Sequence, residues 1–186
     1  MQKFCYIALL RGINVGGKNR IKMADLTACF MKMGFDQVTT YIQSGNVLFL
    51  SEENDKDKLT SLIEKTLSDT FDYQSKIVLL SHLQLEEVIK TAPPSFGKDT
   101  DTYKFDVLFI KPPLTSQQAI DRIQLKEGVD QVAEGKHVVY MSRLKAQASQ
   151  SSLIKLSANP VYQQITVRNW NTTTKLWELA QKITEK

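Results

Sequence analysis

Apolar positions along the first half of the chain follow two spacings, one typical of strands and one typical of helices. Apolar residues at helical spacing predict a helix over 26–33 and a longer amphipathic helix over 59–71. Short runs of branched and aromatic residues predict strands at 4–10, 37–42, 47–50 and 76–80. The resulting order, strand–helix–strand–strand–helix–strand, is that of a ferredoxin-like unit.

The same order of elements restarts after a proline-rich segment at 92–99. Residues 104–110 echo the composition of residues 3–9, and a strand pair is expected on either side of Gly135. Further elements are expected as a helix near 119–123, a short helix near 153–156, a strand at 164–168 and an amphipathic helix at 176–183. We therefore predict an α+β fold with two ferredoxin-like βαββαβ halves in tandem plus a C-terminal helix. The expected domains are an N-terminal half at 1–81, a connecting helix and linker at 82–103, and a C-terminal half at 104–186.

Three helix starts carry residue types that cap helices. Ser81 with Gln84, and Thr115 with Gln118, have the spacing of a capping box. Asn171 is the expected N-cap of the last helix.

Composition changes this picture little. The 186 residues are 42% hydrophobic and 24% charged, which is ordinary for a globular protein and excludes disorder and coiled coil. No apolar run approaches the roughly 20 residues that span a bilayer, and no secretory signal pattern is found. Cys5 and Cys29 stand on apolar positions without a paired spacing. We therefore expect a cytoplasmic protein with buried, inert thiols and no membrane partner.

Charge is distributed unevenly along the chain. Residues 1–24 and residues 135–177 contain no acid, and together they hold 11 of the 24 basic residues. If the fold brings these two spans together, they form one positive face that attracts anions. The alternative is that they are two solvated stretches on different sides of the molecule.

The glycine-rich segment after the first strand resembles a phosphate-binding loop. Gly12-x-x-x-x-Gly17-Lys18 matches most of the P-loop motif, but Asn19 replaces the Ser or Thr that would ligate Mg²⁺. The next helix is also expected only near Met23, too late to hold phosphates, so an NTPase is disfavoured. A looser anion site remains, with backbone N–H groups of Asn14, Gly16 and Gly17 surrounded by Arg11, Lys18 and Arg20. The alternative is a turn that needs glycine only for its backbone conformation.

A second candidate anion site precedes the last helix. Arg168, Asn169 and Asn171 surround a helix N-terminus, where free backbone donors attract phosphate or carboxylate. Trp170 is expected mainly to pack, with base stacking as the alternative. We hypothesise that Arg11 and Arg168 flank a single cleft.

Other reactive residues offer no recognisable catalytic arrangement. Ser44 lacks a base at any informative spacing, and His82 and His137 are expected at the surface. The acids at 52–57 are expected at a helix N-terminus, where they favour the helix dipole. No metal-ligand spacing is present, and no cofactor is expected.

Three runs carry a family resemblance: YIALLRGINVGGKN at 6–19, TYIQSGNV at 40–47 and TVRNWNT at 166–172. With these runs the chain resembles the bacterial family known as domain of unknown function 1697. The resemblance implies a cytoplasmic α+β protein of ferredoxin-like character and carries over no reaction. Thr173 stands where a branched apolar residue is more usual.

Together these features predict binding of an anionic, phosphate-bearing ligand at a basic glycine-rich cleft. The expected partner is a phosphate-bearing small molecule or single-stranded nucleic acid. The alternatives are a small-molecule enzyme that acts on an anionic substrate by electrostatic stabilisation, and a protein-interaction scaffold. The expected ligand-binding residues are Arg11, Asn14, Gly16, Gly17, Lys18, Arg168, Asn169 and Asn171.

Overall fold

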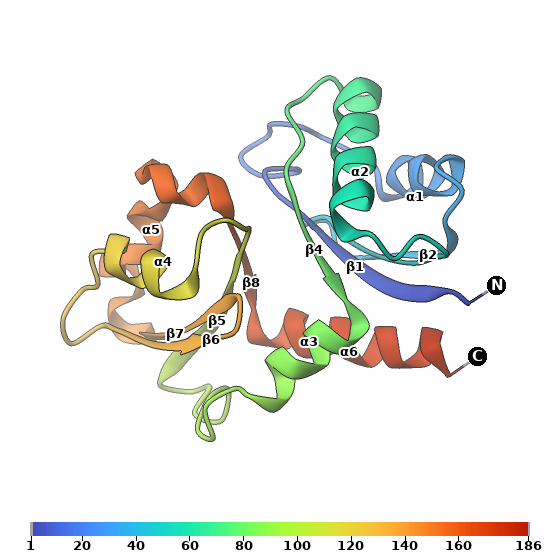
Figure 1. The fold of residues 1–186 in the computed structure, drawn as a ribbon. Helices are drawn as coiled ribbons and strands as arrows, with labels where there is room; N and C mark the ends of the chain where they lie inside the picture. The colour runs from blue at the N-terminus through green and yellow to red at the C-terminus, as the bar shows by residue number, and fades with distance from the viewer. Residues whose placement is uncertain (1, 186) are drawn as a thin grey trace. The chain divides into compact units, whose positions relative to one another are not determined.

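The computed structural model describes residues 2–185, which form two compact units (Figure 1). Of the described residues, the N-terminal unit comprises 2–86 together with 175–185, and the C-terminal unit comprises Glu87–Thr174. Each unit contains one four-stranded antiparallel sheet, so the predicted α+β class is confirmed. The predicted domain boundaries, with a linker at 82–103, stay a prediction.

The N-terminal unit has the strand order β2-β3-β1-β4, which is the ferredoxin-like arrangement. Its elements are β1 (Phe4–Leu10), α1 (Met23–Lys32), β2 (Asp36–Tyr41), β3 (Asn46–Ser51), α2 (Lys56–Phe71) and β4 (Ile77–Ser81). Because side chains alternate along a strand, Tyr6, Ala8 and Leu10 of β1 share one face. That face forms a core with buried residues of α1 and α2. Figure 1 shows the two helices beside the sheet of this unit.

The C-terminal unit repeats this topology with the strand order β6-β7-β5-β8. Its regular elements are β5 (Tyr103–Ile110), α4 (Ser116–Arg122), β6 (Asp130–Gly135), β7 (Val138–Leu144) and β8 (Ile165–Asn169). Where the N-terminal unit has α2, this unit has short helical pieces: η1 (Lys145–Gln150), α5 (Ser152–Lys155), η2 (Leu156–Ala158) and η3 (Pro160–Gln164). Leu108 and Ile110 of β5 lie in the core beneath these pieces and α4. Two ferredoxin-like halves in tandem, with a C-terminal helix, are therefore confirmed.

A helix follows the last strand of each half: α3 (His82–Lys90) after β4, and α6 (Trp170–Thr184) after β8. Ser81 Oγ accepts from the Gln84 amide at 3.2 Å and Gln84 Oε1 accepts from the Ser81 amide at 3.0 Å, so the predicted capping box is present. The box at Thr115 is present too. The prediction of Asn171 as the cap of the last helix is wrong. Asn169 Oδ1 accepts from the Thr172 amide at 2.7 Å, because the helix begins at Trp170.

Across residues 2–185, none of the helices combines the length and the hydrophobicity that crossing a membrane requires. Cys5 and Cys29 are both buried and form no disulfide, as expected. Burial raises the pKa of the Cys5 thiol to about 11, which keeps it unreactive.

Candidate functional site

The glycine-rich loop between β1 and α1 is built around the side chain of Asn14. Its Nδ2 donates to the backbone carbonyls of Ile21 at 3.0 Å and Gln43 at 2.9 Å, and its Oδ1 accepts from the Ile21 amide at 2.9 Å. Asn14 itself has a left-handed backbone, with a φ of 54°. An amide side chain can satisfy three backbone groups in this way. Asn14 therefore organises the loop, and its amide is already engaged.

The loop also packs tightly against the turn between β2 and β3. The Leu10 amide donates to the Gly45 carbonyl at 2.7 Å. A Cβ atom on Gly45 would lie 2.7 Å from Cδ1 of Ile13 and 2.8 Å from Cβ of Leu10, and the φ of Gly45 is +79°. Ile42 in the same turn has a φ of 49°, which is strained for a β-branched residue. The structure thus brings the sequence runs at 6–19 and 40–47 into direct contact.

The tip of the loop is a tight turn and has no P-loop geometry. Gly16 and Gly17 have φ values of 58° and 77°, and they connect Val15 to Lys18, which pair as an antiparallel bridge. The Lys18 amide donates to the Val15 carbonyl at 3.1 Å. A P-loop instead wraps its amides around phosphate and leads directly into a helix, whereas α1 begins only at Met23. The structure therefore agrees with the sequence argument against a P-loop NTPase.

A pocket of about 460 Å³ lies between this loop and the start of α1. The helix N-cap position, Lys22, makes no side-chain cap hydrogen bond, so the first amides of α1 lack the acceptor that an N-cap side chain usually provides. Arg20 and Lys22 line the pocket and are exposed, and neither makes an ion pair within residues 2–185. The other lining residues are Asn14, Gly17, Ile21, Met23 and Gln43. This arrangement presents positive charge and backbone donors to one space, which suits an anion.

The predicted ligand residues fall in both units, and each group is described by itself. In the N-terminal unit, Asn14 and Gly17 line the pocket, Gly16 and Lys18 are exposed at the loop tip, and Arg11 is half-buried. Arg20, Lys22 and Gln43 are pocket residues that were not among the predicted ligand residues. For Arg20 and Lys22 the signal in the sequence was the acid-free basic span at 1–24, whereas Gln43 lies outside that span, in the run at 40–47.

In the C-terminal unit, Arg168 is a buried strand residue and its Nη1 donates to the Val167 carbonyl at 2.8 Å. Burial lowers the pKa of this guanidinium to about 10. Asn169 and Asn171 are exposed and line a second pocket, of about 430 Å³, together with Trp170. The Trp170 ring also packs edge-on against Phe96, with a centroid separation of 5.1 Å. The expected packing role of Trp170 is therefore confirmed.

The second pocket contains a buried ion pair that the sequence analysis missed. Arg143 Nε and Nη2 lie 2.8 and 2.7 Å from Asp106 Oδ2, and each side chain is about 10% exposed. Burial raises the pKa of the Asp106 carboxyl, although Arg143 and Lys104 act in the opposite direction. The available signal was a single acid within the apolar strand at 105–110.

Other candidate residues have structural roles. Ser44 Oγ accepts from Asn46 Nδ2 at 3.0 Å within the turn after β2. His137 lies in the turn between β6 and β7 with a φ of 62°. His82 is half-buried, contrary to the expected surface position, and its Nε2 has no hydrogen-bond partner among the described residues.

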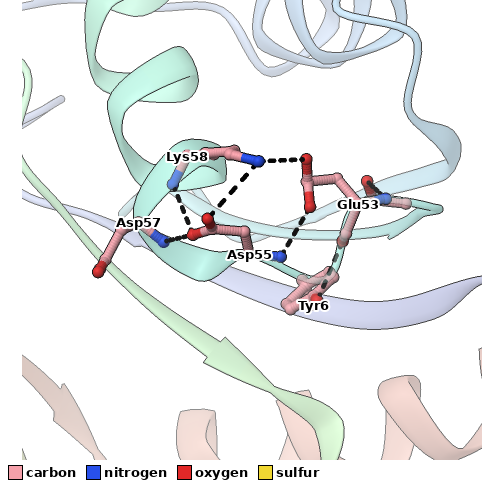
Figure 2. Close-up of polar contacts among 6 residues, drawn as sticks. Tyr6, Glu53, Asp55, Asp57 and Lys58 are labelled. Carbon is pink, nitrogen blue, oxygen red and sulfur yellow. Dashed lines mark hydrogen bonds and ion pairs between the residues drawn. The ribbon is translucent and has the colours of Figure 1, made fainter.

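The acids before α2 form a capping network (Figure 2). Asp55 Oδ1 accepts from the amides of Asp57 and Lys58 at 3.0 and 3.1 Å, and Glu53 Oε1 accepts from the Asp55 amide at 2.9 Å. Tyr6 contributes its hydroxyl, which donates to the Glu53 carbonyl at 3.1 Å. The predicted placement of these acids at a helix N-terminus is confirmed, and the same contacts explain it without a ligand.

Comparison with known proteins gives the chain a family. A solved structure with the description "conserved bacterial protein SP0830 from Streptococcus pneumoniae" superimposes with a TM-score of 0.83 at 28% sequence identity. The match covers 96% of this chain and 99% of the other, so the whole architecture is shared. None of the curated proteins matches the sequence. The sequence profile for proteins of unknown function DUF1697 matches residues 3–140, and the chain belongs to this family.

Proposed function

We propose that this protein binds a phosphate-bearing ligand at the pocket between the glycine-rich loop and α1. The observation that carries the proposal is the uncapped start of α1, which faces a pocket lined by Arg20 and Lys22. A helix N-terminus has the equivalent of about half a positive charge and unpaired amide donors. Phosphate is a common biological group that carries negative charge and accepts hydrogen bonds from backbone amides, so it suits both features.

Charge supports an anion over a neutral ligand. Lys18, Arg20 and Lys22 are exposed and have no carboxylate partner among residues 2–185. Asp25 in the first turn of α1 is the nearest acid in sequence, and it is exposed to solvent. A ligand that replaces water around three unpaired cations gains more than one that meets cations already neutralised.

The ligand class in this proposal is a nucleotide or a single-stranded nucleic acid, bound in the cytoplasm. Gly17 lines the pocket, and Arg11, Gly16 and Lys18 of the same loop are proposed as further ligand contacts. Asn14 acts by positioning the loop. The residues predicted before α6, Arg168, Asn169 and Asn171, are proposed as further ligand contacts of the C-terminal unit.

A thermal-shift assay with matched variants tests the proposal. A nucleotide at about 100 times its Kd stabilises a protein by about 2.7 kcal/mol, which for a chain of this size is roughly 5–10 °C in Tm. We expect Arg20→Ala/Lys22→Ala to reduce this shift, because the loop pocket then no longer contributes to it. The control Lys32→Ala/Lys65→Ala removes the same amount of charge, from the last turn of α1 and from an exposed position of α2. This control should retain the Tm shift. Equal loss in both double variants would mean nonspecific charge attraction and would refute the site.

Salt dependence separates the two ligand classes. Binding of single-stranded nucleic acid weakens steeply with salt, because each contacted phosphate releases counterions. A mononucleotide that engages Arg20 and Lys22 alone should show a much shallower slope. Thermal shifts with a mononucleotide and with a short oligonucleotide, each at two salt concentrations, provide the measurement.

A further inference from the structure

The pocket beside β5 in the C-terminal unit contains a polar pair with unused hydrogen-bonding capacity. Arg143 uses two of its five N–H groups on one oxygen of Asp106. Its remaining N–H groups have no acceptor within residues 2–185, and Asp106 Oδ1 has no donor there. The pair therefore presents donors and an acceptor side by side next to a pocket of about 430 Å³.

The N-terminal unit shows what the same position looks like without this pair. Alternation along β5 places Asp106 on the face of Leu108 and Ile110, just as Tyr6 of β1 shares a face with Ala8 and Leu10. Tyr6 stacks on Phe49 with ring centroids 5.7 Å apart. The fold thus accepts an uncharged aromatic residue at this position, with its hydroxyl hydrogen-bonded to the Glu53 carbonyl.

A buried ion pair at such a position is a poor way to gain stability. Desolvation of two charges offsets most of their attraction, and apolar residues of similar volume are often equally or more stabilising. Asp106 and Arg143 are nevertheless buried to about nine-tenths and lie at the pocket wall. Their chemistry therefore points to recognition of a ligand.

The rest of the lining indicates which ligand. Lys104 lies opposite Arg143 in the register of β5 and β7, and Lys145 follows at the end of β7. With Arg143 these give three cations around one carboxylate. Tyr103 and Trp170 also line this pocket, whose volume is within the range of about 300–1,000 Å³ typical of small-molecule sites.

We propose that this pocket is a nucleotide-binding site of the C-terminal unit, with the Asp106–Arg143 pair reading the base edge. A nucleobase carries a donor and an acceptor side by side, which match Asp106 Oδ1 and the unused N–H groups of Arg143. The Tyr103 and Trp170 rings provide surfaces on which a base can stack. Lys104 and Lys145 contact the phosphate. This site shares no residue with the loop pocket of the N-terminal unit, so the two are tested separately.

The test uses the fluorescence of Trp170. The chain has two tryptophans, and Trp177→Phe leaves Trp170 as the only one, which is excited at wavelengths that tyrosine does not absorb. Trp177 Nε1 is buried without a hydrogen-bond partner among the described residues, so this replacement removes no hydrogen bond. Each of the four nucleoside 5′-monophosphates is titrated into this protein. We expect at least one to quench the emission saturably, and equilibrium dialysis on Arg20→Ala/Lys22→Ala, in which the loop pocket has lost its cations, to give the same Kd.

Variants distinguish base reading from charge attraction. Lys104→Ala/Lys145→Ala should raise Kd at least tenfold, and Asp106→Asn should change the ranking of the four nucleotides. Lys126→Ala, an exposed lysine of the same unit outside this pocket, should leave Kd unchanged. Arg20→Ala/Lys22→Ala should also leave it unchanged, whatever happens to the loop pocket.

Three outcomes would overturn the proposal. The first is no saturable quenching and no retention in dialysis with any of the four nucleotides at millimolar concentration. The second is an equal Kd for Lys104→Ala/Lys145→Ala and Lys126→Ala. The third is inorganic phosphate binding as tightly as the nucleotides, because the base would then contribute nothing.

Discussion

The two halves of this protein cover equivalent sheets in different ways. In the N-terminal unit, the third and fourth strands are joined by α2, a 16-residue helix that buries Leu59, Ile63 and Leu67. In the C-terminal unit, the same connection consists of 3-10 turns and the four-residue α5, and Leu156 and Val161 are its buried apolar residues. A long amphipathic helix buries more apolar surface per residue than a series of turns. The N-terminal connection therefore buries more apolar side chains against its sheet than the C-terminal connection does.

The positions of Tyr6 on β1 and Asp106 on β5 correspond, and their surroundings differ between the two sheets. In the N-terminal unit, Phe49 contacts three other rings, with centroid distances of 5.7 Å to Tyr6, 5.5 Å to Phe30 and 4.3 Å to Phe35. In the C-terminal unit, the corresponding position on β5 is Asp106, which pairs with Arg143. One topology thus supports an aromatic core and a charged pocket at the same place. Fold alone does not determine what such a position does.

The largest expected effect is on the aromatic side of this comparison. Phe49→Ala should cost about 3–5 kcal/mol of unfolding free energy, because it removes a fully buried ring from the aromatic cluster. Met141→Ala is the matched change, since Met141 lies at the corresponding position of β7 and is equally buried. It should cost less, about 2–3 kcal/mol, because a flexible thioether leaves a smaller cavity. Urea unfolding followed by circular dichroism gives both free energies of unfolding. A larger loss of unfolding free energy for Met141→Ala than for Phe49→Ala would contradict the prediction.

The second prediction exchanges the ion pair for the residues of the other half. Arg143→Ser should cost about 3 kcal/mol, because it leaves the Asp106 charge buried without its partner. Asp106→Tyr/Arg143→Ser copies Tyr6 and Ser51, and we expect it to recover more than half of that loss. The free energies come from the same urea experiment on single and double variants. If the double variant is no more stable than Arg143→Ser, the C-terminal sheet does not accommodate a tyrosine at position 106.

The third prediction concerns pH, because two acids of the C-terminal sheet shift in opposite directions. Burial raises the pKa of Asp106, so the folded state holds this proton more tightly than the unfolded chain. Relative to Asp106→Asn, the natural protein should therefore gain stability as pH falls from neutral toward about 4. Thermal unfolding of both proteins across this range measures the difference, and a constant difference would contradict the shift.

Asp130 provides the opposite case. Burial raises its pKa, but hydrogen bonds from Ser151, Lys126 and Ser152 outweigh this and lower it overall. Two of these are backbone amides, at 3.0 Å from Lys126 and 2.9 Å from Ser152. Relative to Asp130→Asn, the natural protein should lose stability as pH falls below about 4. The two difference curves should therefore have opposite slopes.

Most of the fold was predictable from the sequence, because hydrophobic period and turn residues are local signals. The capping boxes at Ser81 and Thr115 were readable for the same reason, since each partner is three residues away. The N-cap of the last helix was assigned to Asn171 because both Asn169 and Asn171 are residue types that cap helices. The sequence does not show where β8 ends, and in the structure it ends at Asn169.

The site was less predictable, because its partners are distant in the sequence. Asp106 and Arg143 meet only through the register of β5 and β7. The role of Asn14 depends on the carbonyls of Ile21 and Gln43, and the latter lies 29 residues away. Local patterns indicated where basic and glycine-rich segments occur. Which groups remain available to a ligand depends on these long-range hydrogen bonds.

The smallest effect on stability is expected at the N-caps of the helices that follow β4 and β8. Variants at these two caps distinguish a residue with a structural role alone from one that also contacts a ligand. Ser81 and Asn169 occupy corresponding positions at the ends of β4 and β8, and each caps the following helix. Aspartate is an equally good N-cap and favours the helix dipole. Ser81→Asp and Asn169→Asp should therefore both change the unfolding free energy by less than about 0.5 kcal/mol.

Their effects on ligand binding should differ, because only Asn169 lines the pocket with Lys104 and Lys145. Asn169→Asp places a negative charge where the phosphate is expected, so it should weaken nucleotide binding in the Trp170 fluorescence titration. Ser81→Asp adds the same charge to the start of α3 and should leave that titration unchanged. If both variants bind nucleotide equally well, the charged end of the C-terminal sheet is as purely structural as the aromatic end of the N-terminal one.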